Sequence, residues 1–189
     1  PLVNYKNLLL DPASGTACLT RPGMSADLGG VAKGYAAGRA ASAVREAGAA
    51  SALLDLGSNI TAVGDKPDGT SWRIAVKDPQ DTQNYICVLS LSDQTASTSG
   101  GYERYFEEDG AVYHHIIDPA TGYPADTGLL SVTVVSENAA LADALSTALF
   151  TLPQAEGQAL LDRYGAEAMW VDASGGEVFS PGFSAYLRT

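Results

Sequence analysis

The stretch from residue 137 to residue 152 constrains the fold most, because it predicts a helix that needs cover on both sides. Four leucines and an alanine recur at helical spacing and form an apolar stripe: Leu141, Leu145, Ala148, Leu149 and Leu152. At about 100° per residue, Asp143 and Thr147 point almost directly away from this stripe. A surface helix would carry charges there, but the neighbours on that face are Ala139, Ala140, Ser146 and Phe150. We therefore expect a helix covered on both sides, holding one carboxylate a single turn from a hydroxyl.

The remaining patterns predict short strands separated by turns, and two further helices. Strands are expected at residues 3–11, 16–20, 71–79, 86–93, 111–118 and 129–136, with two strand segments in 51–64 kinked at Gly57. Helices are expected at residues 30–47 and 154–165, and a closing hairpin at 166–180 with its turn at Gly175 and Gly176. Residues 97–106 are interpreted as a glycine break followed by aromatic residues. Because strands and helices do not alternate regularly, we expect one mixed α+β domain, residues 1–189, with a mostly antiparallel sheet packed against helices.

Charge and cysteine content exclude several classes of function. The net charge is −11 and the basic residues are scattered, which argues against a nucleic-acid partner and against docking on anionic lipid. An anionic ligand would need its own local cation or a metal. Cys18 and Cys87 do not make a zinc pattern with the two adjacent histidines, although a disulfide between them stays open. No apolar run reaches the length of about 18 residues typical of a transmembrane helix.

A glycine turn before the expected helix at 30–47 is a candidate anion site. Gly29 and Gly30 would let backbone N–H groups approach an anion, yet the spacing matches neither a P-loop nor a dinucleotide fingerprint. Lys33 falls on the apolar side of this helix and lies in its first turn, where a cation opposes the helix dipole. A bound anion would offset both penalties. The alternatives are a tight turn feeding a packed helix, and a lysine that extends its stem to the surface.

Four other features carry weaker signals. Gly57, Ser58 and Asn59 predict either a bulge beside a ligand or a plain turn. The hydroxyls of residues 97–99 lack the elbow motif of a serine nucleophile. The spacing of Tyr102, Tyr105 and Phe106 is typical of core residues. In a strand, His114 and His115 would face opposite ways, so at most one enters a given pocket.

Asp143 and Thr147 form the remaining candidate. Residues four apart on a helix are neighbours, so the carboxylate and the hydroxyl can face one spot. Hard oxygen ligands suit Mg²⁺, which prefers a few protein ligands together with water and phosphate oxygens. The alternative is that Asp143 accepts a hydrogen bond from backbone while Thr147 bonds to its own helix.

Five motifs, taken in order, resemble the ApbE family of flavin transferases: DLGGVAKGYAAGRA, LLDLGSNITAVG, STSGGYERYF, YHHIIDPATGYP and DALSTALF. The resemblance runs from about Val3 to Gly182. It implies an ApbE-like, T-fold-like α+β domain whose first part is missing, because the family's proteins are longer at the N-terminus. Residues 1–189 would then be the C-terminal major portion of one flavin transferase domain.

The resemblance also implies roles for residues. Mg²⁺ would be held by Asp143, Thr147 and the backbone carbonyl of Ala32. Lys33 would lie near the phosphates of FAD, and both Lys33 and His115 would be catalytic. The expected contacts with the flavin nucleotide are Asp27, Gly29, Gly30, Lys33, Gly57, Ser58, Asn59, His115 and Asp118. Two positions depart from the usual family form: Ser58 replaces a second glycine, and Gly101 stands where an acidic residue is common.

The implied reaction is a Mg²⁺-dependent transfer of FMN from FAD to a threonine hydroxyl of a target protein, releasing AMP. The expected partners are FAD and an acceptor protein with a Ser/Thr-containing motif, such as a subunit of a redox complex. The alternatives are a Mg²⁺-dependent FAD pyrophosphatase, a non-catalytic FAD-binding protein and an inert folded piece. Lipid-anchored relatives lead us to expect a location at the outer face of the cytoplasmic membrane or in the periplasm.

Overall fold

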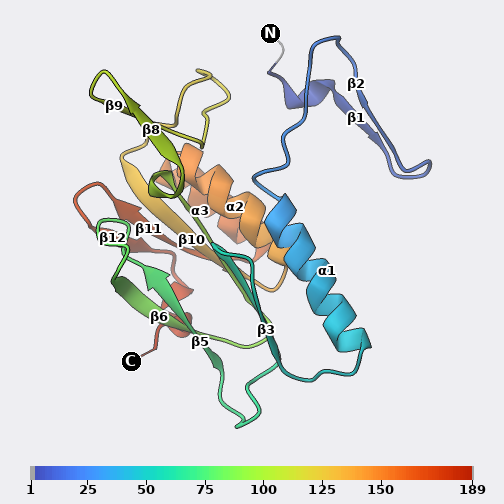
Figure 1. The fold of residues 1–189 in the computed structure, drawn as a ribbon, viewed down its shortest axis with the longest axis vertical. Helices are drawn as coiled ribbons and strands as arrows, with labels where there is room; N and C mark the ends of the chain where they lie inside the picture. Colours follow the sequence, from blue (N-terminus) through green and yellow to red (C-terminus); the bar gives the residue numbers. More distant parts are fainter. Residues whose placement is uncertain (1–2, 189) are drawn as a thin grey trace.

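The computed structural model of the protein describes residues 3–188 and is built around one antiparallel sheet (Figure 1). The sheet has six strands in the order β12-β11-β10-β7-β4-β3. In chain order these strands are β3 (Ala52–Asp55), β4 (Asn59–Val63), β7 (Thr95–Gly100), β10 (Leu129–Ser136), β11 (Glu167–Asp172) and β12 (Glu177–Phe179). The α+β class with a mostly antiparallel sheet and three helices is therefore confirmed.

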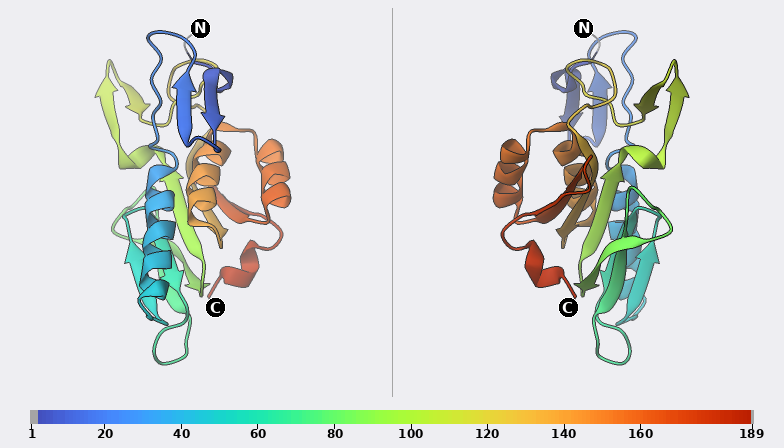
Figure 2. Two further views of the ribbon diagram at one scale, coloured as in Figure 1. Left: turned by 90° about the vertical axis from the view of Figure 1, so that its right-hand side faces the viewer. Right: turned by 90° about the vertical axis from the view of Figure 1, so that its left-hand side faces the viewer.

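Different elements cover the two faces of the sheet (Figure 2). One face carries α1 (Ala32–Glu46), α2 (Ala139–Thr151) and α3 (Gln154–Tyr164). The other face carries a hairpin of β5 (Trp72–Lys77) and β6 (Tyr85–Leu91), with the short 3-10 helix η3 (Phe183–Tyr186). Alternate residues of one strand enter the two cores: Val132 and Val134 pack with α2, whereas Val135 packs with β5 and β6.

Helix α2 is covered on both sides, as its sequence predicts. Its leucine stripe joins the core formed with β10, β11 and α3. On its other side it packs against α1 and β7. The helix begins where the side chain of Asn138 caps it by accepting a 3.1 Å hydrogen bond from the Leu141 N–H. The carboxylate of Asp143 thus lies between two layers of the protein.

Strand β7 was missed by the sequence patterns. Residues 97–106 were expected to form a glycine break, but residues 95–100 form a strand between β10 and β4. The pattern failed because the side chains that β7 turns toward α2 are hydroxyls, which give no hydrophobic alternation. A buried bond of 2.8 Å between the Thr61 and Thr95 hydroxyls belongs to this polar seam.

The expected strand at residues 111–118 is only half correct. Strand β9 (Ala111–His114) pairs with β8 (Tyr105–Glu108), and the 3-10 helix η2 (Gly101–Glu103) precedes this hairpin. His115 therefore lies beyond the strand. The expectation that the nearby aromatic residues belong to the core was wrong for Tyr105 and Phe106, which are 55% and 59% exposed. They lie on a hairpin that projects from the body, and Phe106 stacks on Tyr113 instead.

The N-terminal residues form a separate arm. Strands β1 (Leu8–Asp11) and β2 (Thr16–Leu19) make the expected hairpin, which lies at the same end of the molecule as the start of α1 (Figure 2). The first strand is shorter than the expected residues 3–11, because the 3-10 helix η1 (Tyr5–Asn7) precedes it. Both cysteines are free, so the disulfide left open by the sequence is absent from residues 3–188. Within the same residues, no helix is long and apolar enough to cross a lipid bilayer.

Candidate active site

The first turn of α1 is held against α2 at Gly34. A Cβ atom at this position would lie 2.2 Å from the carbonyl oxygen of Ala139 and 2.6 Å from the Cβ of Asp143, so the approach requires glycine. The Gly34 N–H belongs to the first turn of α1 and has no partner within that helix. It donates a 2.7 Å hydrogen bond to Oδ2 of Asp143. The positive end of one helix therefore anchors the single carboxylate buried in the other.

The second oxygen of Asp143 is held much more loosely. The Ser97 hydroxyl lies 3.4 Å from Oδ1, at the outer limit of a hydrogen bond. Within residues 3–188, no lysine or arginine forms an ion pair with this carboxylate. Asp143 thus accepts a hydrogen bond from the backbone through Oδ2, which is the alternative that the sequence left open. Its Oδ1 can still bind another ligand.

Thr147 lies one turn further along α2, at the edge of a cluster of hydroxyl groups. Its Oγ1 is 3.2 Å from Ser99 Oγ and 3.3 Å from the carbonyl oxygen of Asp143. Ser99 Oγ is also 2.9 Å from Ser146 Oγ. The sequence patterns did not assign Ser97, Ser99 and Ser146 to the site. The signal that could have found them is the alternation of small hydroxyl residues at positions 95, 97 and 99.

The glycine turn lies beside this hydroxyl cluster. The side chain of Asp27 shapes the turn, because its Oδ1 accepts a 2.6 Å hydrogen bond from the Gly29 N–H. A Cβ atom at Gly30 would lie 3.4 Å from the side chain of Thr147. Ala32 lies between Gly30, which adjoins Thr147, and Gly34, which adjoins Asp143. The structure therefore places the glycines on either side of Ala32 next to Thr147 and Asp143.

Lys33 reaches from the same turn of α1 to the turn between β3 and β4. Lys33 is half-buried, and its ammonium group donates a hydrogen bond to Ser58 Oγ. Within residues 3–188 it forms no ion pair. A half-buried cation with only a neutral partner is a site where an anion is favoured. The two expected residues Lys33 and Ser58 are thus in direct contact.

Gly57 and Ser58 make the turn between β3 and β4, with Gly57 at φ 81°, and Asn59 is the first residue of β4. Ser58 is half-buried, but Asn59 is fully buried, and neither polar atom of its side-chain amide has a partner among the described residues. Asn59 lies opposite Ser97 in the strand pair. Its buried amide therefore lies on the same face of the sheet as Ser97, beside the hydroxyl cluster.

His115 and Asp118 lie apart from these contacts, in the segment that follows β9. Asp118 Oδ1 accepts from the Ala120 N–H at 2.8 Å and shapes the turn there. His115 Nδ1 lies 3.1 Å from the carbonyl oxygen of Arg104. Because a carbonyl only accepts, Nδ1 carries the proton, and Nε2 of the neutral ring is an acceptor on an exposed side chain.

His114 has no such unused nitrogen. Its Nε2 lies 3.1 Å from the carbonyl oxygen of Ala125, and its Nδ1 accepts from the Ile116 N–H at 3.3 Å. The ring also packs edge-on against Phe150. Of the two histidines, only His115 is placed to act on a ligand.

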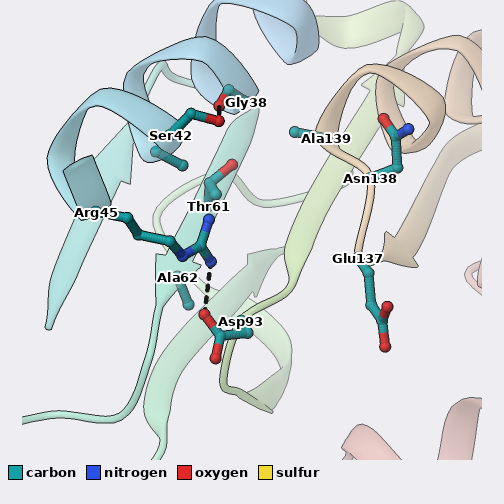
Figure 3. Close-up of a pocket in the computed structure, with 10 residues that line it drawn as sticks. Gly38, Ser42, Arg45, Thr61, Ala62, Asp93, Glu137, Asn138 and Ala139 are labelled. Atoms are coloured by element: carbon teal, nitrogen blue, oxygen red, sulfur yellow. Dashed lines mark hydrogen bonds and ion pairs between the residues drawn. The ribbon is translucent and has the colours of Figure 1, made fainter. Parts of the chain in front are cut away.

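A hollow at the other end of α1 does not match this chemistry. It has a volume of about 260 Å³ and lies between the C-terminal half of α1, β4 and the start of α2 (Figure 3). Arg45 lines it but forms a 2.6 Å ion pair with Asp93. The acidic Glu137 lines it as well. Its cation is already neutralised, so we place the candidate site at the glycine turn.

The donor set at the glycine turn fits a hard divalent cation. Asp143 Oδ1 and the Thr147 hydroxyl are oxygen donors, and Ala32 is exposed at the first position of α1. Among residues 3–188, no group of three or more His, Cys, Asp and Glu side chains could hold a metal. A site here would therefore depend on one carboxylate with hydroxyl and carbonyl oxygens, and its occupancy stays a prediction.

Comparisons with known proteins agree on one family. The model of the ApbE family matches residues 1–170. A FAD:protein FMN transferase of Klebsiella pneumoniae is 40% identical over 172 residues, covering 90% of this chain and 52% of the relative. A FAD:protein FMN transferase of Treponema pallidum is 40% identical over 169 residues, covering 84% of this chain and 47% of the relative.

Solved structures give the same result. The ApbE protein of Thermotoga maritima superimposes with a TM-score of 0.89 at 38% identity, covering 98% of this chain and 60% of that one. The flavin transferase ApbE of Vibrio cholerae has a TM-score of 0.83 at 28% identity, covering 97% of this chain and 59% of that one. This chain spans about half the length of the curated relatives it matches.

Proposed function

Because this chain belongs to the ApbE family, we propose that it transfers FMN from FAD to a threonine hydroxyl of an acceptor protein and releases AMP. The observation that carries the proposal is the half-buried Lys33, which forms no ion pair within residues 3–188 and directly precedes Gly34, the residue that donates to Asp143. The diphosphate of FAD is the part of the substrate that such a cation recognises. The names of the matched relatives support flavin transfer. The dependence on Mg²⁺ and the choice of threonine as the acceptor are our own additions to that activity.

The first turn of α1 would bind the diphosphate. Lys33 would turn its ammonium group from the neutral Ser58 hydroxyl to a phosphate oxygen, forming a charge-assisted hydrogen bond. Backbone N–H groups after Gly29 would cap another oxygen at the positive end of the helix. The turn of Asp27 holds this backbone in place before the substrate arrives.

Asp143, Thr147 and the Ala32 carbonyl would hold Mg²⁺. When bound there, the ion would neutralise charge that builds on the oxygen bridging the two phosphates. The residues that position it are on separate elements, and the Gly34 N–H keeps the Asp143 carboxylate in one orientation. Asp143 thus supports both the local fold and the proposed ligand.

His115 is our candidate for the base. Its Nε2 would accept the proton of the threonine hydroxyl as that oxygen bonds to the FMN-side phosphorus. The bond from this phosphorus to the bridging oxygen breaks, and AMP departs with the bridging oxygen. Hydrogen bonding of Nδ1 to the Arg104 carbonyl fixes the tautomer that leaves Nε2 free. Such a base contributes on the order of 10²–10⁴ in rate.

The test is to incubate this chain with FAD and Mg²⁺, with and without an acceptor peptide that contains threonine. We expect AMP and an FMN-sized mass increase on the peptide, and both should depend on Mg²⁺. AMP and free FMN without peptide labelling would instead indicate a pyrophosphatase, and FAD binding without AMP would indicate a binding protein. Failure to bind FAD would refute the proposal for this chain.

Lys33→Met tests the observation that carries the proposal. Loss of one charged hydrogen bond should weaken FAD binding roughly 10- to 100-fold, measured by fluorescence titration. Lys66→Met is the matched control, because Lys66 lies in a turn after β4 and pairs with Asp68 at 3.8 Å. Equal FAD affinities for the Lys33 variant and the unmodified chain would show that the diphosphate binds elsewhere.

A further inference from the structure

We propose that Ser99 is a positioning residue, which accepts the hydroxyl proton of Thr147 and so turns the Thr147 oxygen lone pairs toward the cation site. This inference rests on the proposed function, because it concerns the Thr147 side chain as a ligand of a divalent cation. It assigns a role to β7, a strand whose hydroxyl groups the proposed reaction does not itself use.

The carbonyl oxygen of Asp143 is the last acceptor in a series of hydrogen bonds, and it determines which way each hydroxyl proton points. Ser146 Oγ donates to the carbonyl oxygen of Asp143 at 3.0 Å, since a carbonyl cannot donate. Ser146 has then used its proton, so across the 2.9 Å contact Ser99 donates to Ser146. Ser99 Oγ keeps its lone pairs free, and one of them accepts from the Thr147 hydroxyl at 3.2 Å.

The competing acceptor for Thr147 is already occupied. The Asp143 carbonyl lies 3.3 Å from Thr147 Oγ1. In an α-helix this carbonyl also accepts the N–H of the residue four positions later, Thr147 itself. With the Ser146 hydroxyl as a second donor, both of its lone pairs are used. Ser99 is therefore the better acceptor, and the protons run from Thr147 through Ser99 and Ser146 to Asp143.

The consequence concerns the orientation of a ligand. A threonine hydroxyl binds a cation through its lone pairs, so its proton must point away from the cation. Ser99 holds the proton on the side of the sheet, which leaves the lone pairs facing the glycine turn beside Gly30. Partners that orient a metal ligand typically change metal affinity about 10- to 100-fold when removed.

The test measures cation binding by the folded chain, with Mn²⁺ as the probe and its electron paramagnetic resonance signal as the readout of free ion. Ser99→Ala should weaken Mn²⁺ binding roughly 10-fold. Ser99→Thr keeps the hydroxyl and should restore most of the affinity. The matched control is Thr98→Val on the opposite face of β7, which removes the 2.8 Å bond to the Thr133 hydroxyl and should leave Mn²⁺ affinity unchanged.

A second readout separates positioning from stability. Thermal unfolding is compared with and without Mn²⁺, since a ligand of the folded state raises the midpoint, and tighter binding at a given Mn²⁺ concentration raises it further. Ser99→Ala should reduce the Mn²⁺-induced shift, whereas a merely structural effect would lower both midpoints equally. Unchanged Mn²⁺ affinity in Ser99→Ala, with weakened affinity in Asp143→Ala, would overturn this inference alone. Mn²⁺ binding that is unaffected by Asp143→Ala would overturn the proposed metal site itself.

Discussion

The contact between α1 and α2 at Gly34 predicts that Gly34→Ala destabilises the fold, although helix propensity alone predicts the opposite. Alanine is favoured over glycine within a helix by about 1 kcal/mol, so propensity alone predicts that Gly34→Ala stabilises the fold. The new Cβ would instead lie 2.2 Å from the Ala139 carbonyl oxygen, far inside van der Waals contact with a backbone atom. The start of α1 must move away from α2, and the 2.7 Å bond from the Gly34 N–H to Asp143 must lengthen or break.

The two penalties outweigh the gain in propensity. Overpacking a close contact costs about 1–3 kcal/mol. Losing a hydrogen bond to a charged group costs about 1.5–3 kcal/mol. After subtracting the propensity term, we expect Gly34→Ala to lower the free energy of unfolding by roughly 1.5–5 kcal/mol. At about 2–4 °C per kcal/mol for a chain of this size, the loss is easily measured in a thermal scan.

Gly38→Ala is the control on the same helix. One turn further along α1, a Cβ atom at Gly38 would meet only the Ala139 Cβ at 3.7 Å, which is ordinary contact. This variant should keep or raise the free energy of unfolding by up to about 1 kcal/mol. Urea unfolding of both variants, followed by circular dichroism, compares them directly. Equal stabilisation by the two alanines would refute the close helix crossing, and with it the anchoring of Asp143 by α1.

Three further predictions concern other groups. His115→Ala should retain FAD affinity but lose transfer to the acceptor peptide, as followed by AMP release; a collapse of FAD affinity would contradict the role as base. Burial, with a smaller effect of Glu177, raises the pKa of Cys87 to about 11, so at pH 8 a thiol reagent should label Cys18 alone in the folded protein. Equal labelling of both thiols at pH 8 would count against the burial of Cys87. Because the folded protein favours the protonated thiol, the free energy of unfolding should fall as the pH rises above the thiol pKa of the unfolded chain, about 8.5. Arg45→Ala should lower the free energy of unfolding by less than about 1 kcal/mol in urea titrations, because its ion pair with Asp93 is largely exposed.

The sequence predicted those elements whose apolar side chains repeat. The leucines of α2 indicated the helix, and the absence of charges opposite them correctly indicated cover on both sides. The turn at Gly57 and the hairpin at residues 166–180 followed from glycine positions. Strand β7 was not predicted, because Thr95 bonds to Thr61 of β4, and Ser97 and Ser99 bond to α2, instead of packing apolar groups.

The candidate site was predictable in its parts but not in its contacts. Motif resemblance singled out Lys33, Asp143 and Thr147, yet nothing in the spacing showed that Gly34 donates to Asp143 or that Lys33 reaches Ser58. Such contacts join residues 109 and 25 positions apart, so they depend on how helices and strands pack. A pattern read along the chain has no access to them.

The charges of the candidate site explain why this acidic protein would need both a lysine and a metal ion to bind a dinucleotide. The whole chain carries a net charge of −11, so its long-range field repels an anionic substrate. Within the candidate site, the carboxylates of Asp27 and Asp143 outweigh the positive charge of Lys33, which leaves the diphosphate unneutralised. The N-terminal dipole of α1 is already directed in part at Asp143 through the Gly34 N–H. A divalent cation would offset most of this excess negative charge, and a carboxylate buried beside the glycine turn makes physical sense as the group that attracts it. This charge count, together with the oxygen donors of Asp143 and Thr147, supports the proposed dependence on Mg²⁺.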